Sequence, residues 1–318
     1  MRRLTKTICK SLMKAFPAIP EKNDPHLWET FKSDRYILSS DEIKREIRHS
    51  SSLASYEYEQ DSSHSWLIKY FFPRISPKDL HGKVLLDLGC FTGGRLTAWV
   101  ETYQLKKGIG IDINSLFQQA AEEFAQSKGI SNIEFHTGVG ENLPFADNSI
   151  DFIVSTDVFE HVEDVGHVLG ECYRVLKKGG KLLVVFPQYY QPLASHLGMV
   201  TTFPALNWFF KGETIAKAYT EIINERGEEA KWYAPVAYPL RDWEKLFSLN
   251  GISVKRFRKL ISRQGWVASD TIVKPIFSDG RKSNKLIFRI LSGVMVPLAY
   301  MPYLEELFLG RVNYILTK

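Results

Sequence analysis

Cysteine is scarce in this chain. The 318 residues include three cysteines, Cys9, Cys90 and Cys172, which lie far apart in the sequence. Disulfide-stabilised folds need several paired cysteines, and zinc sites need clustered cysteine and histidine ligands. The composition therefore excludes both classes and favours a reduced, cytoplasmic compartment.

Long uninterrupted hydrophobic runs are also absent, and the sequence predicts no membrane-spanning helix. The most apolar segment, Leu286–Leu309, contains Arg289 and two prolines, and we expect it to pack against the core. Contact with a membrane surface is the alternative, and basic residues near the N-terminus would contribute to it. These residues are Arg2, Arg3, Lys6, Lys10 and Lys14. Because lysines interrupt the apolar stretch that follows Met1, we expect no export signal there.

No large excess of one charge is present, since the net charge is +5. Its distribution is uneven, with +3 for residues 1–80, −5 for 81–181 and +7 for 182–318. The basic residues are dispersed rather than arranged as a dense arginine-rich stripe, which disfavours a nucleic acid as the substrate. With 44% apolar residues the chain can bury a full core, as one enlarged domain or two.

Short apolar runs alternate with helical patterns between Lys83 and Phe186. The predicted strands are 83–88, 108–112, 132–136, 150–154 and 181–186. Such alternation predicts an α/β fold with a doubly wound, mostly parallel sheet. Ligands of such sheets bind at the carboxyl ends of the strands, near the point where the strand order reverses.

The segments that flank this core are interpreted as additions to it. Residues 1–80 form an N-terminal helical extension, with predicted helices at Asp41–His49 and Ser65–Phe72. Residues 81–186 form the ligand-binding core. Residues 187–318 contain insertions, at 187–239 and about 262–309, and the last two strands of the same sheet. In this last segment we expect a helix at Leu240–Leu249 and strands at Ile252–Arg258 and Arg311–Thr317.

A glycine-rich turn follows the first predicted strand and opens into a helix. This glycine loop, residues 87–94, reads Asp-Leu-Gly-Cys-Phe-Thr-Gly-Gly. It has no Gly-Lys-Ser/Thr of a P-loop, and its spacing differs from the G-x-G-x-x-G of dinucleotide sites. An acid before the first glycine suits a ligand with a cationic end. The spacing disfavours an NAD-dependent oxidoreductase.

Asp112 ends the second predicted strand, where a carboxylate can accept two hydrogen bonds from a ribose diol. With the glycine loop, it indicates a nucleoside that carries a zwitterionic tail. This arrangement resembles class I S-adenosylmethionine-dependent methyltransferases of the broad type 11 subgroup. The segments Gly138–Phe152, Ser155–Val162 and Leu176–Gly180 resemble later motifs of that family.

The resemblance implies a seven-stranded sheet with an antiparallel last strand, S-adenosyl-L-methionine as cofactor and a small or lipid- or sugar-type acceptor. Asp87 would lie near the ammonium of the methionine tail, Asp112 would hold the ribose and Ile113 would pack on the adenine. The loop backbone would line the tail, and further residues would border the adenine or close the pocket beneath the sulfonium. These further residues are Gly89, Cys90 and Gly93 for the tail, Glu141 and Asn142 for the adenine, and Thr156 and Asp157 for the pocket. The sequence departs from the family at Phe91, where glycine is usual, and at Val139, where aspartate is common.

Candidates for a general base are His161, after the fourth strand, and Tyr189 and His196, after the fifth. His161 could instead orient the start of a helix, and the other two could pack the insertion. Asp157, Glu160 and His161 could bind a Mg²⁺-like ion, but helix capping is the favoured interpretation, and no metal site is predicted. The aromatic run Trp208–Phe210 is interpreted as core or as a lid.

We expect a methyltransferase that acts on an oxygen or nitrogen of its acceptor. The alternative is a non-catalytic module that keeps the fold and binds the nucleoside or a partner through residues 187–309. The sequence leaves the oligomeric state open.

Overall fold

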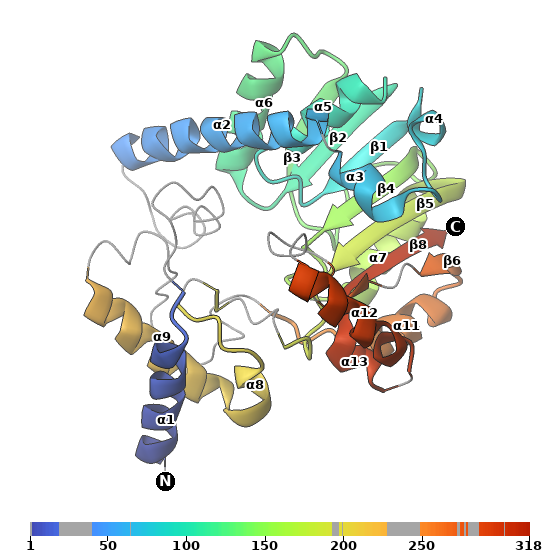
Figure 1. Cartoon of the computed structure of the whole chain (residues 1–318). Coiled ribbons are helices and arrows are strands. Elements are labelled where there is room, and N and C mark those ends of the chain that lie inside the picture. The colour runs from blue at the N-terminus through green and yellow to red at the C-terminus, as the bar shows by residue number, and fades with distance from the viewer. Residues whose placement is uncertain are drawn as a thin grey trace. The chain divides into compact units, whose positions relative to one another are not determined.

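The chain forms two compact units, which are described separately (Figure 1). The computed structural model describes residues 2–18, 40–63, 65–192, 197–198, 200–227, 249–271, 274–276, 278, 286–301 and 303–318. The sheet unit comprises Lys32–Phe186, Phe257–Ile272 and Asn313–Lys318. The second unit comprises Met1–Phe31, Pro187–Arg256 and Val273–Val312.

The sheet unit alternates strands and helices in the order that the hydrophobic pattern predicts. Its strands are β1 (Val84–Leu88), β2 (Lys107–Asp112), β3 (Ile133–Thr137), β4 (Ile150–Thr156), β5 (Leu176–Phe186), β6 (Val267–Thr271) and part of β8 (Leu309–Thr317). Its helices are α2 (Ser40–Ser63), α3 (Trp66–Phe71), α4 (Pro77–Leu80), α5 (Gly94–Thr102), α6 (Ser115–Ser127), α7 (Val165–Val175) and most of α11 (Val254–Arg263).

The strand order is β3-β2-β1-β4-β5-β8-β6, and a two-residue strand, β7 (Lys274–Pro275), pairs with the beginning of β8. Strands β1 to β5 are parallel to one another, and β6 is antiparallel to β8. The chain leaves β1 toward β2 on one side, whereas β4 pairs with its other side. The carboxyl end of β1 therefore lies at the switch point where ligands of such sheets bind. The predicted α/β fold class is confirmed.

The strands form because their side chains are apolar on both faces of the sheet, as expected for parallel strands covered by helices. In β1, Leu85 and Leu86 are fully buried, and Trp99 of α5 packs into the same core as Leu85. Helix α2 lies against α5 and α6, as Figure 1 shows. A Cβ atom on Gly94 would overlap the backbone of Ala54 in α2. Glycine at this position therefore permits α2 to pack directly on the beginning of α5.

One predicted strand is wrong. Residues 252–258 were expected to be extended, but helix α11 begins at Val254. Val254, Phe257 and Ile261 are buried, whereas Arg258 and Lys259 are exposed, which is the spacing of an amphipathic helix. The strand that pairs with β8 is β6, which follows the helix.

The other predicted elements outside the core have different outcomes. The helix predicted at Asp41–His49 is the first part of the longer helix α2. The helix predicted at Ser65–Phe72 is α3, and the last predicted strand is β8. The helix predicted at Leu240–Leu249 lies, except for its last residue, outside the described residues.

The second unit is mainly helical where it is described. It contains α1 (Arg2–Ala15), α8 (Leu206–Phe209), α9 (Gly212–Arg226), α12 (Leu286–Tyr300) and α13 (Glu305–Phe308). Helix α1 buries Cys9 and Met13 in one core with Tyr219 of α9. Lys10 donates hydrogen bonds to Glu221 and Glu225 at 2.7 and 2.6 Å, and Lys6 and Lys14 also pair with these glutamates. The basic face of α1 is thus engaged within its own unit.

Candidate functional site

The glycine loop has an unusual backbone. Gly89, Phe91 and Gly93 adopt left-handed φ angles of +79°, +50° and +73°. Glycine adopts this conformation without penalty, whereas a residue with a side chain is strained by about 1–3 kcal/mol. A Cβ atom on Gly89 would overlap the side chain of Val158, and one on Gly93 would lie 2.5 Å from Cβ of Ala121. Both glycines are therefore required by conformation and by packing.

The loop is fastened to the end of β2. The N–H groups of Gly89 and Cys90 donate to the carbonyl of Ile111 at 2.8 and 3.1 Å. The Asp112 carboxylate accepts from the Phe91 N–H at 2.9 Å and from the Asn114 N–H at 3.1 Å, through different oxygens. Each carboxylate oxygen retains a second lone pair. Asp112, the predicted ribose-binding residue, thus lies directly against the loop.

Four carboxyl groups gather beneath the loop, and we call Glu57, Asp61, Asp87 and Asp112 the acidic cluster. Burial raises the pKa of Asp87 from its usual 3.8 to about 7; Arg95 partly offsets this effect, and repulsion by the other three carboxylates adds to it. Burial also raises the pKa of Glu57 and of Asp112. The cluster therefore carries more carboxyl groups than the Arg95 guanidinium can neutralise, and a cationic ligand would stabilise it.

Helix α2 supplies half of the acidic cluster. Arg95, the residue after the glycine loop, lies 3.3 Å from Asp61 and 3.6 Å from Glu57. Glu57 accepts a hydrogen bond from the hydroxyl of Thr92 at 3.0 Å, and Asp61 accepts one from the Trp99 indole at 2.9 Å. Through these contacts, helix α2 of the N-terminal extension stabilises the glycine loop. Sequence reasoning missed this role, although Arg95 directly after the two glycines was a visible signal.

Cys90 and Phe91 occupy the centre of the loop. Cys90 is buried, and burial raises the pKa of its thiol well above the usual value, so the thiol is a poor nucleophile. The Phe91 ring packs edge-on against Phe117 of α6, with ring centroids 4.6 Å apart. The aromatic side chain at this family-atypical position is therefore packed on the helix that follows β2.

The predicted adenine-side residues lie after β2 and β3. The side chain of Ile113 is 73% exposed. Asn142 is also exposed, and its N–H donates to the carbonyl of Val139 at 3.2 Å. Glu141 accepts hydrogen bonds from the backbone N–H groups of Glu163 and Asp164, at 2.8 and 3.1 Å, just before α7. Its carboxylate therefore links the loop after β3 to the start of α7.

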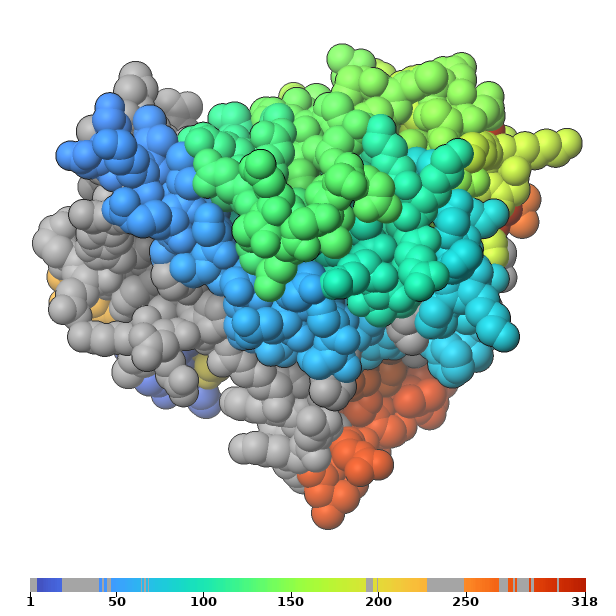
Figure 2. Space-filling model, turned by 90° about the horizontal axis from the view of Figure 1, so that it is seen from above, coloured from blue at the N-terminus to red at the C-terminus, as the bar shows by residue number. Residues whose placement is uncertain are grey.

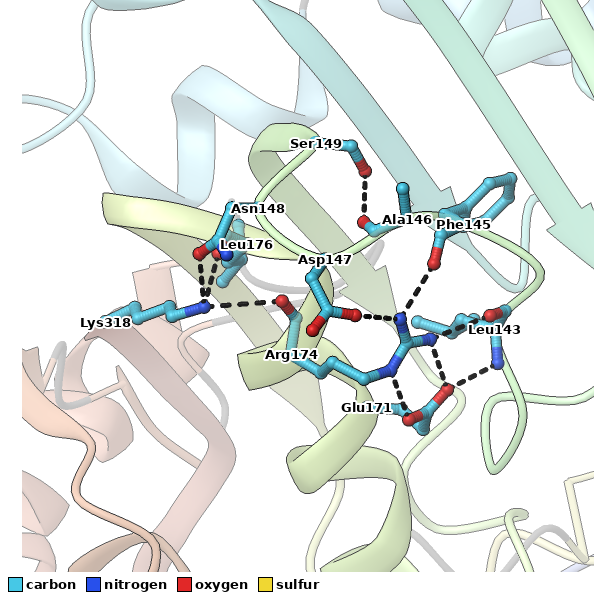
Figure 3. A network of polar contacts seen from close by, with 10 residues as sticks. All are labelled: Leu143, Phe145, Ala146, Asp147, Asn148, Ser149, Glu171, Arg174, Leu176 and Lys318. Carbon is cyan, nitrogen blue, oxygen red and sulfur yellow. Dashed lines mark hydrogen bonds and ion pairs between the residues drawn. The ribbon is translucent and has the colours of Figure 1, made fainter.

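Arg174 of α7 also binds the loop after β3 (Figure 3). Its guanidinium donates to the carbonyls of Leu143 and Phe145 at 2.9 and 2.8 Å, and to Asp147 at 2.7 Å. Glu171, one turn earlier, pairs with the same guanidinium and accepts from the Leu143 N–H at 2.8 Å. One arginine thus fixes three successive points of the loop.

We expect Arg174→Lys to loosen this loop. A lysine ammonium cannot reproduce the planar fork that contacts two carbonyls and two carboxylates at once. Because the side chain is partly exposed, the expected loss is about 1–2 kcal/mol of unfolding free energy. Denaturant unfolding measures it, with Lys177→Arg as the matched control, since Lys177, at the beginning of β5, makes an ion pair with Asp151. Equal stability of Arg174→Lys and the parental chain would contradict the role.

The residues after β4 complete this edge of the sheet. The Thr156 hydroxyl oxygen is buried and makes no hydrogen bond to any of the described residues. Asp157 is exposed at a left-handed φ of +55°, and its N–H donates to the carbonyl of Val185 at 2.8 Å. The His161 imidazole is one-third exposed and lies 3.7 Å from the buried Glu160 carboxylate. Within the described ranges, no group of three potential metal ligands was found, at these residues or elsewhere.

The remaining predicted residues belong to the second unit. The rings of Tyr189 and Tyr190 pack edge-on, with centroids 5.0 Å apart, and the Trp208 indole donates to the Tyr190 carbonyl at 3.1 Å. Phe209 is 72% exposed, so this aromatic run is only partly core. His196 lies outside the described residues.

A family model described as a methyltransferase domain matches residues 86–184. This segment is a methyltransferase domain. It contains the glycine loop, Asp112 and the loop held by Arg174. The match confirms the family that the glycine loop and the later motifs predict.

Proteins with similar sequences include methyltransferases. An uncharacterized methyltransferase, YcgJ, of Bacillus subtilis is 36% identical over 108 residues, which cover 34% of this chain and 41% of the relative. The sterol 24-C-methyltransferase of Pneumocystis carinii is 31% identical over 180 residues, which cover 50% and 44% of the two chains. The chain thus spans less than half of the length of both curated relatives.

Among solved structures, an S-adenosylmethionine dependent methyltransferase from Mesorhizobium loti superposes with a TM-score of 0.50 at 13% identity. The superposition covers 82% of this chain and all of the other one. At this identity the likeness shows the fold alone.

Proposed function

We propose that the chain is an S-adenosylmethionine-dependent methyltransferase. The observation that carries the proposal is the acidic cluster beneath a glycine loop held in left-handed conformations. The excess of buried carboxyl groups complements a ligand that carries a sulfonium and an ammonium, and the loop backbone allows that ligand to approach closely. A pyrophosphate, which is anionic, would be repelled by the same groups.

The residues of the methyltransferase domain fit the parts of this cofactor. The free lone pairs of the Asp112 carboxylate accept hydrogen bonds from the ribose diol. Asp87 balances the ammonium, beside the backbone of Gly89, Cys90 and Gly93. The buried Thr156 hydroxyl, which has no hydrogen-bond partner among the described residues, can donate to the ligand.

The adenine would be bound at the outer side of the same strand ends. The exposed Ile113 side chain offers an apolar surface for one face of the base. The loop of Glu141 and Asn142 borders its edge, and Arg174 keeps that loop in place. Asp157 closes the pocket beneath the sulfonium.

The chemistry that the bound cofactor supplies is a methyl group on a cationic sulfur, whose carbon–sulfur bond breaks as the acceptor oxygen or nitrogen bonds to the carbon. The site contributes mainly alignment, which can be worth about 7–11 kcal/mol. An acceptor that carries a proton also needs a base, which can add roughly 10²–10⁴-fold. We propose His161 for this role, because its imidazole is one-third exposed and lies 3.7 Å from the Glu160 carboxylate. Tyr189 and His196 are further candidates for this base.

Transfer of a labelled methyl group from S-adenosylmethionine to a component of a small-molecule extract tests the proposal. We expect a labelled product with the parental chain, and a strongly reduced rate with His161→Gln if the acceptor loses a proton. Binding of S-adenosylhomocysteine without any transfer, over extracts that contain polar metabolites and lipids, would favour the non-catalytic module. The absence of binding at millimolar ligand would refute the proposal.

A further inference from the structure

Helix α12 presents large apolar side chains to the solvent. Leu286, Ile290 and Val294 recur at every fourth position, and they are 72%, 54% and 59% exposed. Tyr300 and Tyr303, at the end of the helix and just after it, are also exposed. The orange-red atoms of α12 are visible at the surface in Figure 2. We call these five side chains the apolar face of α12.

The opposite side of α12 is more buried. Ser292 and Ala299 are 8% and 2% exposed, and Leu291, Met295 and Leu298 beside them are half-buried. A surface helix of a globular protein normally buries its large apolar residues and exposes its polar ones. Helix α12 departs from this pattern because Leu286, Ile290 and Val294 are exposed, although we expected its segment to pack against the core. A contiguous set of large exposed apolar side chains is typical of an interaction site.

Basic residues precede and interrupt the apolar face. The 25 residues from 280 to 304 contain four basic residues and no acidic one, and Glu305 and Glu306 follow them. Arg289, within α12, is exposed. The Lys255 ammonium lies 5.8 Å from the centre of the Tyr303 ring, and Arg256 is exposed beside it in the sequence. The nearby Glu306 carboxylate accepts hydrogen bonds from the N–H groups of Val254 and Lys255, so its charge is used to cap α11.

We propose that the apolar face of α12 binds the surface of an anionic lipid bilayer. A helix of 15 residues is about 22 Å long and lies in the interface rather than crossing the bilayer. None of the helices in the described part of the chain is long and apolar enough to span one. Tyrosines at the edge of an apolar face are typical of the headgroup level of a bilayer. The exposed basic residues Lys255, Arg256 and Arg289 would be attracted to anionic lipids. The inference stands independently of methyl transfer.

Sedimentation with unilamellar vesicles of equal parts phosphatidylcholine and phosphatidylglycerol tests the proposal with the full chain. We expect the parental chain to bind, and to bind vesicles of phosphatidylcholine alone more weakly. Val294→Glu places a charge in the middle of the apolar face and should weaken binding by about tenfold or more. Val267→Glu is the matched control, because Val267 is 62% exposed on β6, and it should bind like the parental chain.

Two results would overturn the proposal. One is a parental chain that does not bind the anionic vesicles. If Val294→Glu then changes the oligomeric state, the apolar face of α12 joins copies of the chain instead. The other is equal vesicle binding by the parental chain and Val294→Glu. Circular dichroism of the variants establishes that each remains folded, and Ile290→Glu provides a second substitution on the same face.

Discussion

Replacing Asp112 by alanine is expected to weaken the binding of S-adenosylhomocysteine by roughly 10²–10⁴-fold. The carboxylate would lose two hydrogen bonds to the ribose diol, and hydrogen bonds to a charged group contribute about 1.5–3 kcal/mol each. The substitution also removes the acceptor of the Phe91 and Asn114 N–H groups. Isothermal titration measures the affinity, and thermal unfolding of the ligand-free variant measures the structural loss separately.

A matched control distinguishes the two roles of Asp112. Asp151, at the beginning of β4, also accepts a backbone hydrogen bond, from Val84 at 2.9 Å, but at the opposite edge of the same sheet. Asp151→Ala should lower stability without changing the affinity for S-adenosylhomocysteine. If Asp112→Ala lowers only the stability and leaves the affinity within about threefold of the parental value, Asp112 supports the loop and does not bind the ribose.

The part of the site that the sequence predicts is the part built from local patterns. Buried parallel strands are continuous apolar runs, and the residues that follow them are brought to one edge by the fold itself. Asp87, Gly89 and Asp112 could therefore be assigned together before their distances were known. The resemblance to a known family extended the assignment to the loops after β3 and β4.

The contribution of α2 could not be predicted in the same way. The predicted helix ended at His49, because the serine-rich stretch that follows has a weak helical period. The helix continues to Ser63 because it packs on α5 and α6, a contact that depends on residues more than 30 positions away. The ion pairs of Glu57 and Asp61 with Arg95 depend on the same tertiary contact. A buried electrostatic partner supplied by a distant helix leaves no local pattern.

The wrong strand at residues 252–258 has a different cause. A short run of alternating apolar and basic residues fits both a strand and one face of a helix. The burial of Val254, Phe257 and Ile261 shows that the period is that of a helix, and extending the window to Arg263 would have favoured it. The strand at the sheet edge, β6, is short and contains polar residues, so its hydrophobic signal was weaker.

Asp87→Asn is expected to stabilise the ligand-free protein at pH 8. The folded pKa of about 7 lies above the unfolded value near 3.8, so between these pH values the folded protein binds more protons than the unfolded one. Stability then falls as the pH rises through this range, and the cost of the buried carboxylate is complete above pH 7. One pKa unit corresponds to about 1.4 kcal/mol, so the variant should gain up to about 4 kcal/mol at pH 8 and almost nothing near pH 3.

The opposite pH dependence is expected for a control at Asp79. Hydrogen bonds from Ser76 lower the pKa of Asp79, whose carboxylate therefore stabilises the folded protein above the unfolded pKa. Asp79→Asn should reduce stability at neutral pH, and the loss should vanish as the pH falls through the folded pKa. Urea unfolding across this pH range measures both variants. A gain for Asp87→Asn that is the same at every pH would contradict the assignment to ionisation.

The gain in stability should be accompanied by a loss of function. If Asp87 balances the ammonium of the cofactor, the parental chain must ionise this carboxyl on binding, and its affinity for S-adenosylhomocysteine should fall about tenfold per pH unit below 7. Asp87→Asn should bind more weakly than the parental chain at pH 8 and lose this pH dependence. A variant that is more stable at pH 8 but binds the ligand unchanged would show that the buried charge of Asp87 serves no part of the site. If the site binds a cation through Asp87, Asp87→Asn should be both more stable and weaker in binding S-adenosylhomocysteine.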